Sequence, residues 1–472
     1  MRIGPESPAR SGRMVMWVAA LMVLVGIAGS VWLLSCSKDP APTLPPPTRT
    51  PLPTYTAVVQ GPTPTIALAA AVATPTAVPP TATLVPATPT VVPATATAVP
   101  PTPTATPVPP TATLGPTPMP PVPQAKPLQM QSPEYGMHAS LWWRPEVASR
   151  DMGMIKEAGF GWIKQHIGWN LVEGAGKGVY DWSRVDWIVA ECNKLGLDLL
   201  VRVDCPPAWA GGDGECMLNT PPARNSDLGD FLSAMATRYK GRIRAYEVWN
   251  EPNLAREWGG RAPNAAQYVA MLREAYRRIK QADPNAMVIS AGLTPTGTYS
   301  PEAIPDDIYL EQMYQAMAGS SNGYFDVLGA HAAGYKAPPE LDPVQAAADP
   351  TYGGGRWFCF RRVEDLRAVM VKYGDGNKQV AITEFGWTSD PIRPAYAWHR
   401  VEEETKADYF VRAYQWAKQN WQPWIGVMSL IYIADPDWNA QDHEQYWWAI
   451  SEPGYPDFRP RPAYFKLKAM AK

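Results

Sequence analysis

Residues 128–472 are predicted to fold as an α/β protein of the (β/α)8 class, the TIM barrel. Short apolar segments of strand length alternate there with longer segments of helical periodicity. Eight such pairs in about 345 residues match a barrel with enlarged loops. The alternative is a doubly wound open sheet, which is disfavoured because no glycine-rich phosphate loop follows the first strand.

The strands and helices of this barrel can be placed in order along the chain. Strands are expected at residues 135–141, 162–167, 197–203, 243–249, 287–291, 325–330, 379–383 and 425–431. Helices are expected at residues 145–158, 183–195, 228–239, 265–282, 306–318, 363–373, 402–420 and 461–470. The second helix is expected to open with a capping box, Ser183-x-x-Asp186, and to end at Gly196. An irregular loop containing Trp169 and Glu173 is expected before it.

The first 36 residues are expected to direct the chain to a membrane. Arg2, Arg10 and Arg13 precede an uncharged run at residues 14–34, which is the pattern of an export signal or a signal anchor. The run ends in Leu33-Leu34-Ser35-Cys36, which resembles a bacterial lipobox in which Cys36 becomes lipidated. A lipoprotein and a single-pass membrane anchor both remain open, and both leave the rest of the chain on the extracellular face.

Residues 37–127 are expected to form a disordered stalk. Pro, Thr, Ala and Val dominate this stretch, with near-repeats such as Ala-Thr-Pro-Thr. Proline has no amide donor and a fixed φ, so neither a helix nor a sheet can propagate. An extended linker follows from this composition, whether or not its threonines carry glycans.

The composition excludes several classes of function. A net charge of −2 without a basic run argues against a nucleic-acid partner. The five histidines are scattered and none pairs at ligand spacing, so no metal and no cofactor is expected. Gly-x-Ser-x-Gly is absent, which disfavours a serine hydrolase. The 20 Trp and 21 Tyr, against nine Phe, suit the faces of sugars, although most of them are expected in the core.

Two glutamates follow strands that lie across the barrel mouth from each other. Asn250-Glu251-Pro252 ends the fourth strand, and Glu384 ends the seventh. In a (β/α)8 barrel these strand ends face one cleft. Glycoside hydrolysis requires two carboxyl groups that flank one bond. The simpler alternatives are a turn at Asn250-Glu251-Pro252 and a salt-bridged rim carboxylate at Glu384.

The motifs around these glutamates resemble a known group of enzymes. Trp249-Asn250-Glu251-Pro252-Asn253 and Thr383-Glu384-Phe385-Gly386-Trp387 resemble the paired signatures of the clan A retaining glycoside hydrolases. Further motifs are most similar to family 39-type and cellulase-like glycosidases: Tyr180-Asp181-Trp182-Ser183, the Pro-x-Trp loop at Trp209, and Phe325-Asp326-Val327 leading to His331. Family 39-type enzymes include xylosidases, iduronidases and hydrolases of bacterial exopolysaccharides.

The resemblance implies roles for the two glutamates and their neighbour. Glu251 would be the general acid/base and Glu384 the nucleophile, with carboxyl groups about 5–5.5 Å apart. The pKa of Glu251 would be raised by the Glu384 carboxylate beside it. Asn250 would hydrogen-bond the sugar 2-hydroxyl, unless it is a turn residue that satisfies backbone groups.

Further candidates for substrate contact lie on other strand ends and loops. His331 is expected in the cleft or, alternatively, bonded to a rim carbonyl; Tyr335 follows it at a spacing that makes contact with Glu384 doubtful. The remaining candidates are rim groups His138, Lys164 and His166, and the possible sugar platforms Trp209, Trp387 and Trp438. A disulfide between Cys205 and Cys216 is plausible outside the cell, while Cys192 and Cys359 look buried or isolated.

The sequence therefore predicts a surface-tethered, retaining glycosidase that cleaves a polysaccharide or oligosaccharide, for which β-linkages are expected. The alternative is a non-catalytic carbohydrate-binding or wall-attachment barrel. The loop at residues 332–360 is open to two interpretations, a wall that gives exo action or the side of an open groove that gives endo action.

Overall fold

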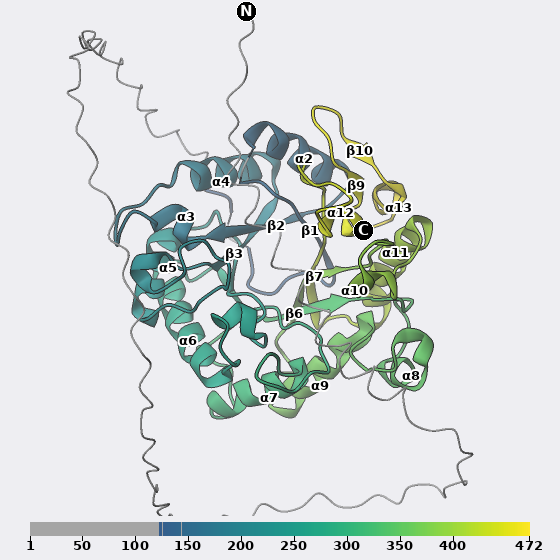
Figure 1. Cartoon of the computed structure of the whole chain (residues 1–472). Helices are drawn as coiled ribbons and strands as arrows, with labels where there is room; N and C mark the ends of the chain where they lie inside the picture. Colours follow the sequence, from purple (N-terminus) through teal and green to yellow (C-terminus); the bar gives the residue numbers. More distant parts are fainter. Residues whose placement is uncertain (1–121, 125, 143) are drawn as a thin grey trace, which may run out of the picture. The chain divides into compact units, whose positions relative to one another are not determined.

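The computed structural model describes residues 122–124, 126–142 and 144–472, and it contains a barrel of parallel strands (Figure 1). The barrel strands are β1 (Glu134–His138), β2 (Trp162–Gly168), β3 (Asp198–Asp204), β4 (Ala245–Val248), β5 (Met287–Ser290), β6 (Leu328–Ala333), β7 (Val380–Gly386) and β8 (Ile425–Leu430). They pair in the order β5-β4-β3-β2-β1-β8-β7-β6. Parallel bridges from Ile289 to Val327 and from Leu293 to Ala330 connect the two ends of this order and close the ring.

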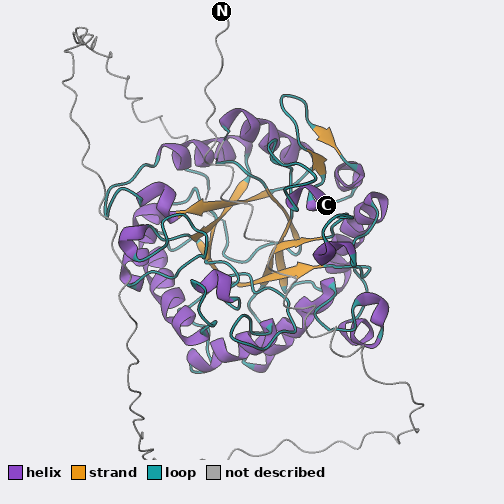
Figure 2. Cartoon of the chain, viewed as in Figure 1, coloured by secondary structure: helices purple, strands orange, loops and turns teal. Residues whose placement is uncertain are grey.

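A helix follows each strand, and these helices surround the barrel (Figure 2). They are α2 (Pro145–Glu157), α4 (Ser183–Leu195), α5 (Asn225–Arg238), α6 (Ala265–Ala282), α7 (Asp306–Ala316), α9 (Val363–Lys372), α11 (Glu403–Asn420) and α13 (Pro462–Ala469). Shorter helices lie in the loops: α3 (Trp169–Glu173), α8 (Pro343–Ala348), α10 (Pro394–Ala397) and α12 (Gln445–Trp448). A short antiparallel pair, β9 (Ser451–Glu452) and β10 (Arg459–Pro460), lies near the C-terminus. The predicted (β/α)8 barrel is confirmed.

Two local expectations are wrong. The segment with Trp169 and Glu173 is the helix α3, in which the Trp169 indole donates to the Glu173 carboxylate at 2.6 Å. The capping box at Ser183 does not form, because Ser183 is already the first helical residue of α4. Asp186 instead accepts hydrogen bonds from Arg238, the last residue of α5, and from Tyr239, which follows it. Gly196 ends α4 in the left-handed conformation, as expected (φ 64°).

The barrel interior is apolar at one end and charged at the other. A cluster near the amino ends of the strands includes Met130, Trp162, Leu200 and Ala245. Side chains two residues further along a strand point to the same face. Polar and charged residues therefore follow in register on three strands: Lys164 and His166, Arg202 and Asp204, and Glu247. This pattern directs charged groups towards the carboxyl ends.

Several sequence expectations fall on residues that the structure does not describe. The anchor at residues 1–36 with Cys36, and the stalk up to residue 121, lie outside the described residues. At its far end, the segment expected to be stalk contacts the barrel: Lys126 forms an ion pair with Asp198 at 2.6 Å, and Arg244 donates to the Pro127 carbonyl. Within the described residues, none of the helices has the length and apolar character that crossing a bilayer requires.

Candidate active site

The end of β4 places Glu251 in the barrel mouth through an unusual backbone. Trp249 has φ 80° and Glu251 has φ 35°, in the left-handed region that non-glycine residues rarely adopt. Trp249 is consequently turned to the outside of the barrel, where its indole donates to the Glu257 carbonyl at 2.7 Å. The Glu251 amide donates to the Gly292 carbonyl at 3.2 Å. Such strain persists only where the surrounding structure holds it, and it concentrates at functional sites.

Glu384 reaches the same mouth because β7 is bulged. The register of β7 shifts against β8 between Ile382 and Phe385, so both Thr383 and Glu384 lie on the inner side. Bulges commonly redirect a side chain beside an active site. With the bulge, Glu384 turns from the helix-facing side of the strand into the barrel mouth.

The contacts of Glu384 fall on one carboxylate oxygen, Oε1. Lys164 Nζ is 3.0 Å from it and Arg202 Nη1 3.4 Å, while the nearest ring nitrogens of His138 and His331 are 3.9 and 4.0 Å away. Burial alone would raise the pKa of Glu384, but Lys164 and then the other three groups hold it well below its usual value. Glu384 is therefore ionised, and its second oxygen has none of these contacts.

Lys164 is shared between two carboxylates. It has no exposed surface, and its Nζ is 2.9 Å from Oε2 of Glu247, which is also fully buried. Glu247 also accepts the Gly292 amide at 3.1 Å. The row Glu247–Lys164–Glu384 thus runs from the barrel interior to the mouth and holds the Glu384 carboxylate in place.

His331, within β6, lies between the two proposed catalytic carboxylates. Its Nδ1 is 2.9 Å from Glu251 Oε1, and its Nε2 is 4.0 Å from Glu384 Oε1. Burial lowers the pKa of His331, but Glu384 and Glu251 raise it more, so it lies above the usual value. Gly292 makes room for this ring, since a Cβ there would be 2.3 Å from the imidazole. His331 is in the cleft, and the alternative of a rim carbonyl partner is wrong.

The expected raised pKa of Glu251 is wrong. Burial and the Glu384 charge do raise it, but the Arg256 guanidinium and His331 lower it more, and the net shift is downward. Arg256 follows Glu251 in η2 (Ala255–Trp258) and donates to Oε2 of the carboxylate. Both side chains are at least nine-tenths buried. In the free protein Glu251 is thus an ion-paired carboxylate.

We predict that Arg256→Met raises the pKa of Glu251, because burial and the Glu384 carboxylate then act without opposition from the guanidinium. Loss of the protonated acid limits activity at high pH, so the basic limb of kcat/KM should move upward by roughly 1–3 pH units. The measurement is the pH profile of kcat/KM. Arg261→Met, an exposed arginine in the same loop, is the control. Superimposable basic limbs in the two variants would show that Arg256 does not set this pKa.

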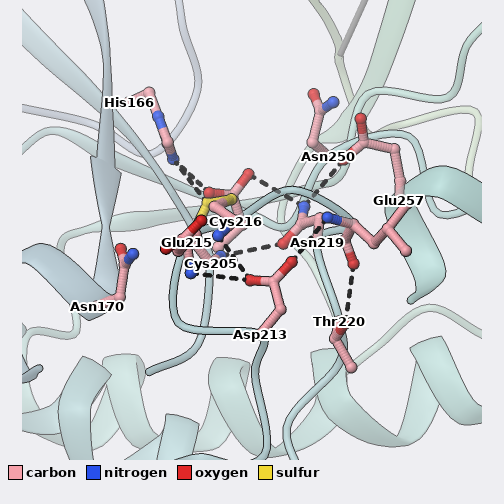
Figure 3. Close-up of a disulfide and its surroundings, with 12 residues drawn as sticks. His166, Asn170, Cys205, Asp213, Glu215, Cys216, Asn219, Thr220, Asn250 and Glu257 are labelled. Atoms are coloured by element: carbon pink, nitrogen blue, oxygen red, sulfur yellow. Dashed lines mark hydrogen bonds and ion pairs between the residues drawn. A yellow bond between two sulfur atoms is a disulfide. The ribbon is translucent and has the colours of Figure 1, made fainter. Parts of the chain in front are cut away.

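Asn250 and His166 belong to a hydrogen-bonded network that reaches Glu384 through Arg202. Asn250 Oδ1 accepts from Arg202 at 2.9 Å, which fixes the amide orientation. His166 contacts Asp204, and near it Cys205 and Cys216 form a disulfide (Figure 3). His138 sits against Glu384 Oε1 and packs on the ring of Tyr432 at 5.2 Å.

The free cysteines and one cluster of possible metal ligands lie among the described residues. Cys192 and Cys359 are buried and free, as expected. His166, Asp204 and Cys205 bring three potential ligand atoms within 4.8 Å of one another. The sulfur of Cys205 is already bonded to Cys216, so this cluster offers no thiolate to a metal ion.

The expected aromatic platforms are placed differently. Trp387 is wrong as a sugar platform, because it is fully buried between Phe385 and Phe410 on the outer side of β7 and donates to the Ala337 carbonyl. Trp209 donates to the Glu173 carbonyl and packs on Trp169, away from the carboxylates.

The other two aromatic candidates lie near the carboxylates. Trp438 packs edge to face on Tyr432 at 5.4 Å, next to the mouth. The Tyr335 hydroxyl donates to the Pro295 carbonyl at 3.4 Å and not to Glu384.

The carboxylates open into one cavity of about 1100 Å3. Glu251, His331, Tyr335 and Glu384 line it, together with groups that the sequence did not single out. Those lining groups include Arg256, Trp357, Phe358, Trp398, His399, Tyr432 and Glu444. Strand alternation could have identified Arg202 and Glu247, whereas Arg256 and the loop aromatics carry no periodic signal.

The barrel with this site is similar to solved glycoside hydrolase structures. A family 39 glycoside hydrolase from the gut symbiont Bacteroides cellulosilyticus matches with a TM-score of 0.51 at 19% identity, over 73% of this chain and 63% of that one. A glucosidase from Croceicoccus marinus matches with a TM-score of 0.52 at 13% identity, over 73% and 68%. GH5_18 from Streptomyces cattleya, solved in complex with GlcNAc, matches with a TM-score of 0.50 at 14% identity, over 72% and 80%.

At the level of sequence, no protein-family model and no curated protein matches the chain. The chain spans less than two thirds of the length of the family 39 enzyme. Structural likeness at these identities establishes a shared (β/α)8 fold. What the protein does has to be argued from its own site.

Proposed function

We propose that the protein is a retaining glycosidase that cleaves β-linked units of an oligosaccharide or polysaccharide. One observation carries this proposal: carboxylates from the ends of β4 and β7 line one cavity and share His331. Two carboxyl groups flanking one bond are what glycoside hydrolysis requires. A barrel that only bound sugars would have no need of this pair.

The two glutamates differ in the way the reaction demands. Glu384 is ionised, and its free oxygen attacks the anomeric carbon to form a glycosyl ester. Glu251 gives a proton to the departing oxygen, and in the second step its carboxylate takes a proton from the attacking water. His331 Nδ1, 2.9 Å from Glu251, is the adjacent group able to supply that first proton.

A second candidate function is non-catalytic carbohydrate binding. The ion pair of Glu251 with Arg256 favours it, because an acid held as a carboxylate cannot protonate a leaving group. The strained backbone at Glu251 and the charge cluster around Glu384 favour catalysis, since binding alone needs neither.

We predict that a 2-deoxy-2-fluoro glycoside with an activated leaving group labels Glu384 and no other residue. The fluorine slows hydrolysis of the ester, so the glycosyl group stays on the nucleophile. Peptide mapping by mass spectrometry, carried out with gluco- and xylo-configured reagents, locates the glycosyl group. The Glu384→Gln variant is the control and should remain unlabelled. Labelling elsewhere, or none with any reagent, would favour the binding protein.

We also propose that the chain is held at the extracellular face of the membrane. The support is the basic flank, the uncharged run at residues 14–34 and the lipobox-like end at Cys36. The Pro- and Thr-rich stretch would then extend the barrel from the surface. Recovery of the full-length chain from the cytosolic fraction would contradict this location.

A further inference from the structure

One side of the cavity is formed by aromatic rings rather than charged groups. We call it the aromatic wall: Tyr335, Trp357 and Phe358 from the loop after β6, and Trp398 and His399 from the loop after β7. The Phe358 ring lies 4.9 Å from Tyr335 and 5.1 Å from Trp398, edge to face in both cases. Tyr335, Trp357, Phe358 and Trp398 are half-buried, so part of each remains open.

The rings are held in place by the protein itself. A Cβ at Gly297 would lie 2.1 Å from the Trp357 ring, so the backbone after β5 packs directly on that ring. Gly353 has φ 92°, and a Cβ there would be 2.6 Å from Phe358 and 2.9 Å from Trp398. Rings that are fixed before a ligand arrives lose little side-chain entropy when it binds. The aromatic wall is therefore preorganised.

An unpaired polar atom lies within the same surface. The His399 side chain is 1% exposed, and its Nδ1 has no hydrogen-bond partner among the other described residues. Burial lowers the pKa of His399 to about 3, so the ring is neutral. A buried nitrogen of this kind is unfavourable unless a ligand supplies a partner. A ligand that fits the aromatic wall should therefore have an apolar face and also a group that can hydrogen-bond.

We propose that the aromatic wall is a subsite for a pyranose unit next to the cleaved bond, on the Glu251 side. A pyranose has a C–H face that packs against rings and hydroxyls that pair with His399 Nδ1. A wholly apolar group would leave that nitrogen unpaired. The aromatic wall begins on the Glu251 side, because burial, Asp306 and the Glu251 carboxylate raise the pKa of the Tyr335 hydroxyl, and Glu384 is not among these causes.

This subsite rests on the proposed function for its position relative to the cleaved bond, whereas sugar binding to it needs no catalysis. The test is therefore an equilibrium titration of the full chain carrying Glu384→Gln. The probes are β-1,4-linked glucose, xylose and N-acetylglucosamine ladders of one to four units, with methyl and octyl β-glucoside. In at least one ladder, affinity should rise roughly tenfold from one unit to two, as measured by calorimetry.

Variants on the Glu384→Gln background identify the surface responsible. Trp398→Ala should lose most of the roughly tenfold gain while affinity for the single unit is kept. Trp398→Phe should restore much of it, and His399→Phe should lower it while keeping a ring. Trp424→Ala is the control, since Trp424 directly precedes β8 at the opposite end of the barrel. Thermal melts check that each variant is folded.

Three other outcomes overturn the subsite proposal, and a fourth separates it from the catalytic proposal. A gain from one unit to two that survives Trp398→Ala would place the second sugar elsewhere, and no gain in any ladder would remove the subsite. A gain from methyl to octyl glucoside without a gain along the ladders would assign the aromatic wall to an apolar aglycone. If fluoro-glycosides label nothing while the gain depends on Trp398, the subsite stands and the catalytic proposal fails.

Discussion

Replacing Glu384 by glutamine should lower kcat on the order of 10⁴-fold or more on every substrate that the parent protein cleaves. The amide cannot form the glycosyl ester, so the double displacement is lost altogether. Glu251→Gln should lower kcat by roughly 10²–10⁴-fold, the usual contribution of a general acid. The loss at Glu251 should be smallest with phenolate leaving groups, because these depart without a proton. That dependence on the leaving group separates the two roles.

The measurement is steady-state kinetics on aryl glycosides of graded leaving-group pKa. Glu311→Gln, a carboxylate on the outer helix α7, is the control and should match the parent protein. Calorimetric unfolding shows whether each variant is folded. Full activity of both Glu251→Gln and Glu384→Gln would refute the assignment of the catalytic pair.

The fold was predictable because it follows from local patterns. Apolar residues at helical spacing predict α6, and five of them, Tyr268, Met271, Leu272, Ala275 and Ile279, are buried in the structure. Eight strand-length apolar segments implied closure, and the ring is closed. Short-range periodicity and turn residues are enough for this, since each element must bury one face.

Strand alternation is enough to place Arg202 and Glu247 in the barrel interior, but it does not place the groups at the end of β7. Alternation alone would put Glu384 on the helix-facing side with Ile382, and Trp387 on the inner side, and the bulge of β7 reverses the positions of Glu384 and Trp387. The position of Trp249 could not be foreseen. It shares parity with Glu247, yet its left-handed φ turns it to the outside.

Contacts that form across loops leave no trace in the sequence. Arg256 meets Glu251 only because the chain folds back through η2, and that contact reverses the direction of a pKa shift that carboxylate proximity alone suggested. The aromatic wall likewise joins loops after β6 and β7. Local sequence patterns do not encode which loop aromatics converge.

Lys164→Met should impair both stability and activity, for two separate reasons. Removing one partner of a buried ion pair leaves Glu247 buried and unpaired, so the free energy of unfolding should fall by about 3–5 kcal/mol. The pKa of Glu384 should rise, because Lys164 is the first of the charges that lower it. As the pH is lowered, the Glu384 carboxylate then becomes protonated at a higher pH than in the parent protein. Because it must be ionised to act, the acid limb of kcat/KM should move to higher pH. Misplacement of the nucleophile should cost roughly 10²-fold in kcat.

The double variant Lys164→Met/Glu247→Leu separates these two effects. With both buried charges gone, much of the stability should return, because an apolar pair can replace a buried ion pair without loss. The acid limb should stay displaced, since Glu384 still lacks its nearest cation. Lys406→Met is the matched control: this lysine is equally buried but pairs with Glu403 and contacts neither Glu247 nor Glu384, so it should lower stability without moving the acid limb. Denaturant unfolding and pH profiles measure the two quantities. If the acid limb of the double variant matched that of the parent protein, Lys164 would have no direct effect on the pKa of Glu384. Its role would then be to stabilise the barrel interior alone.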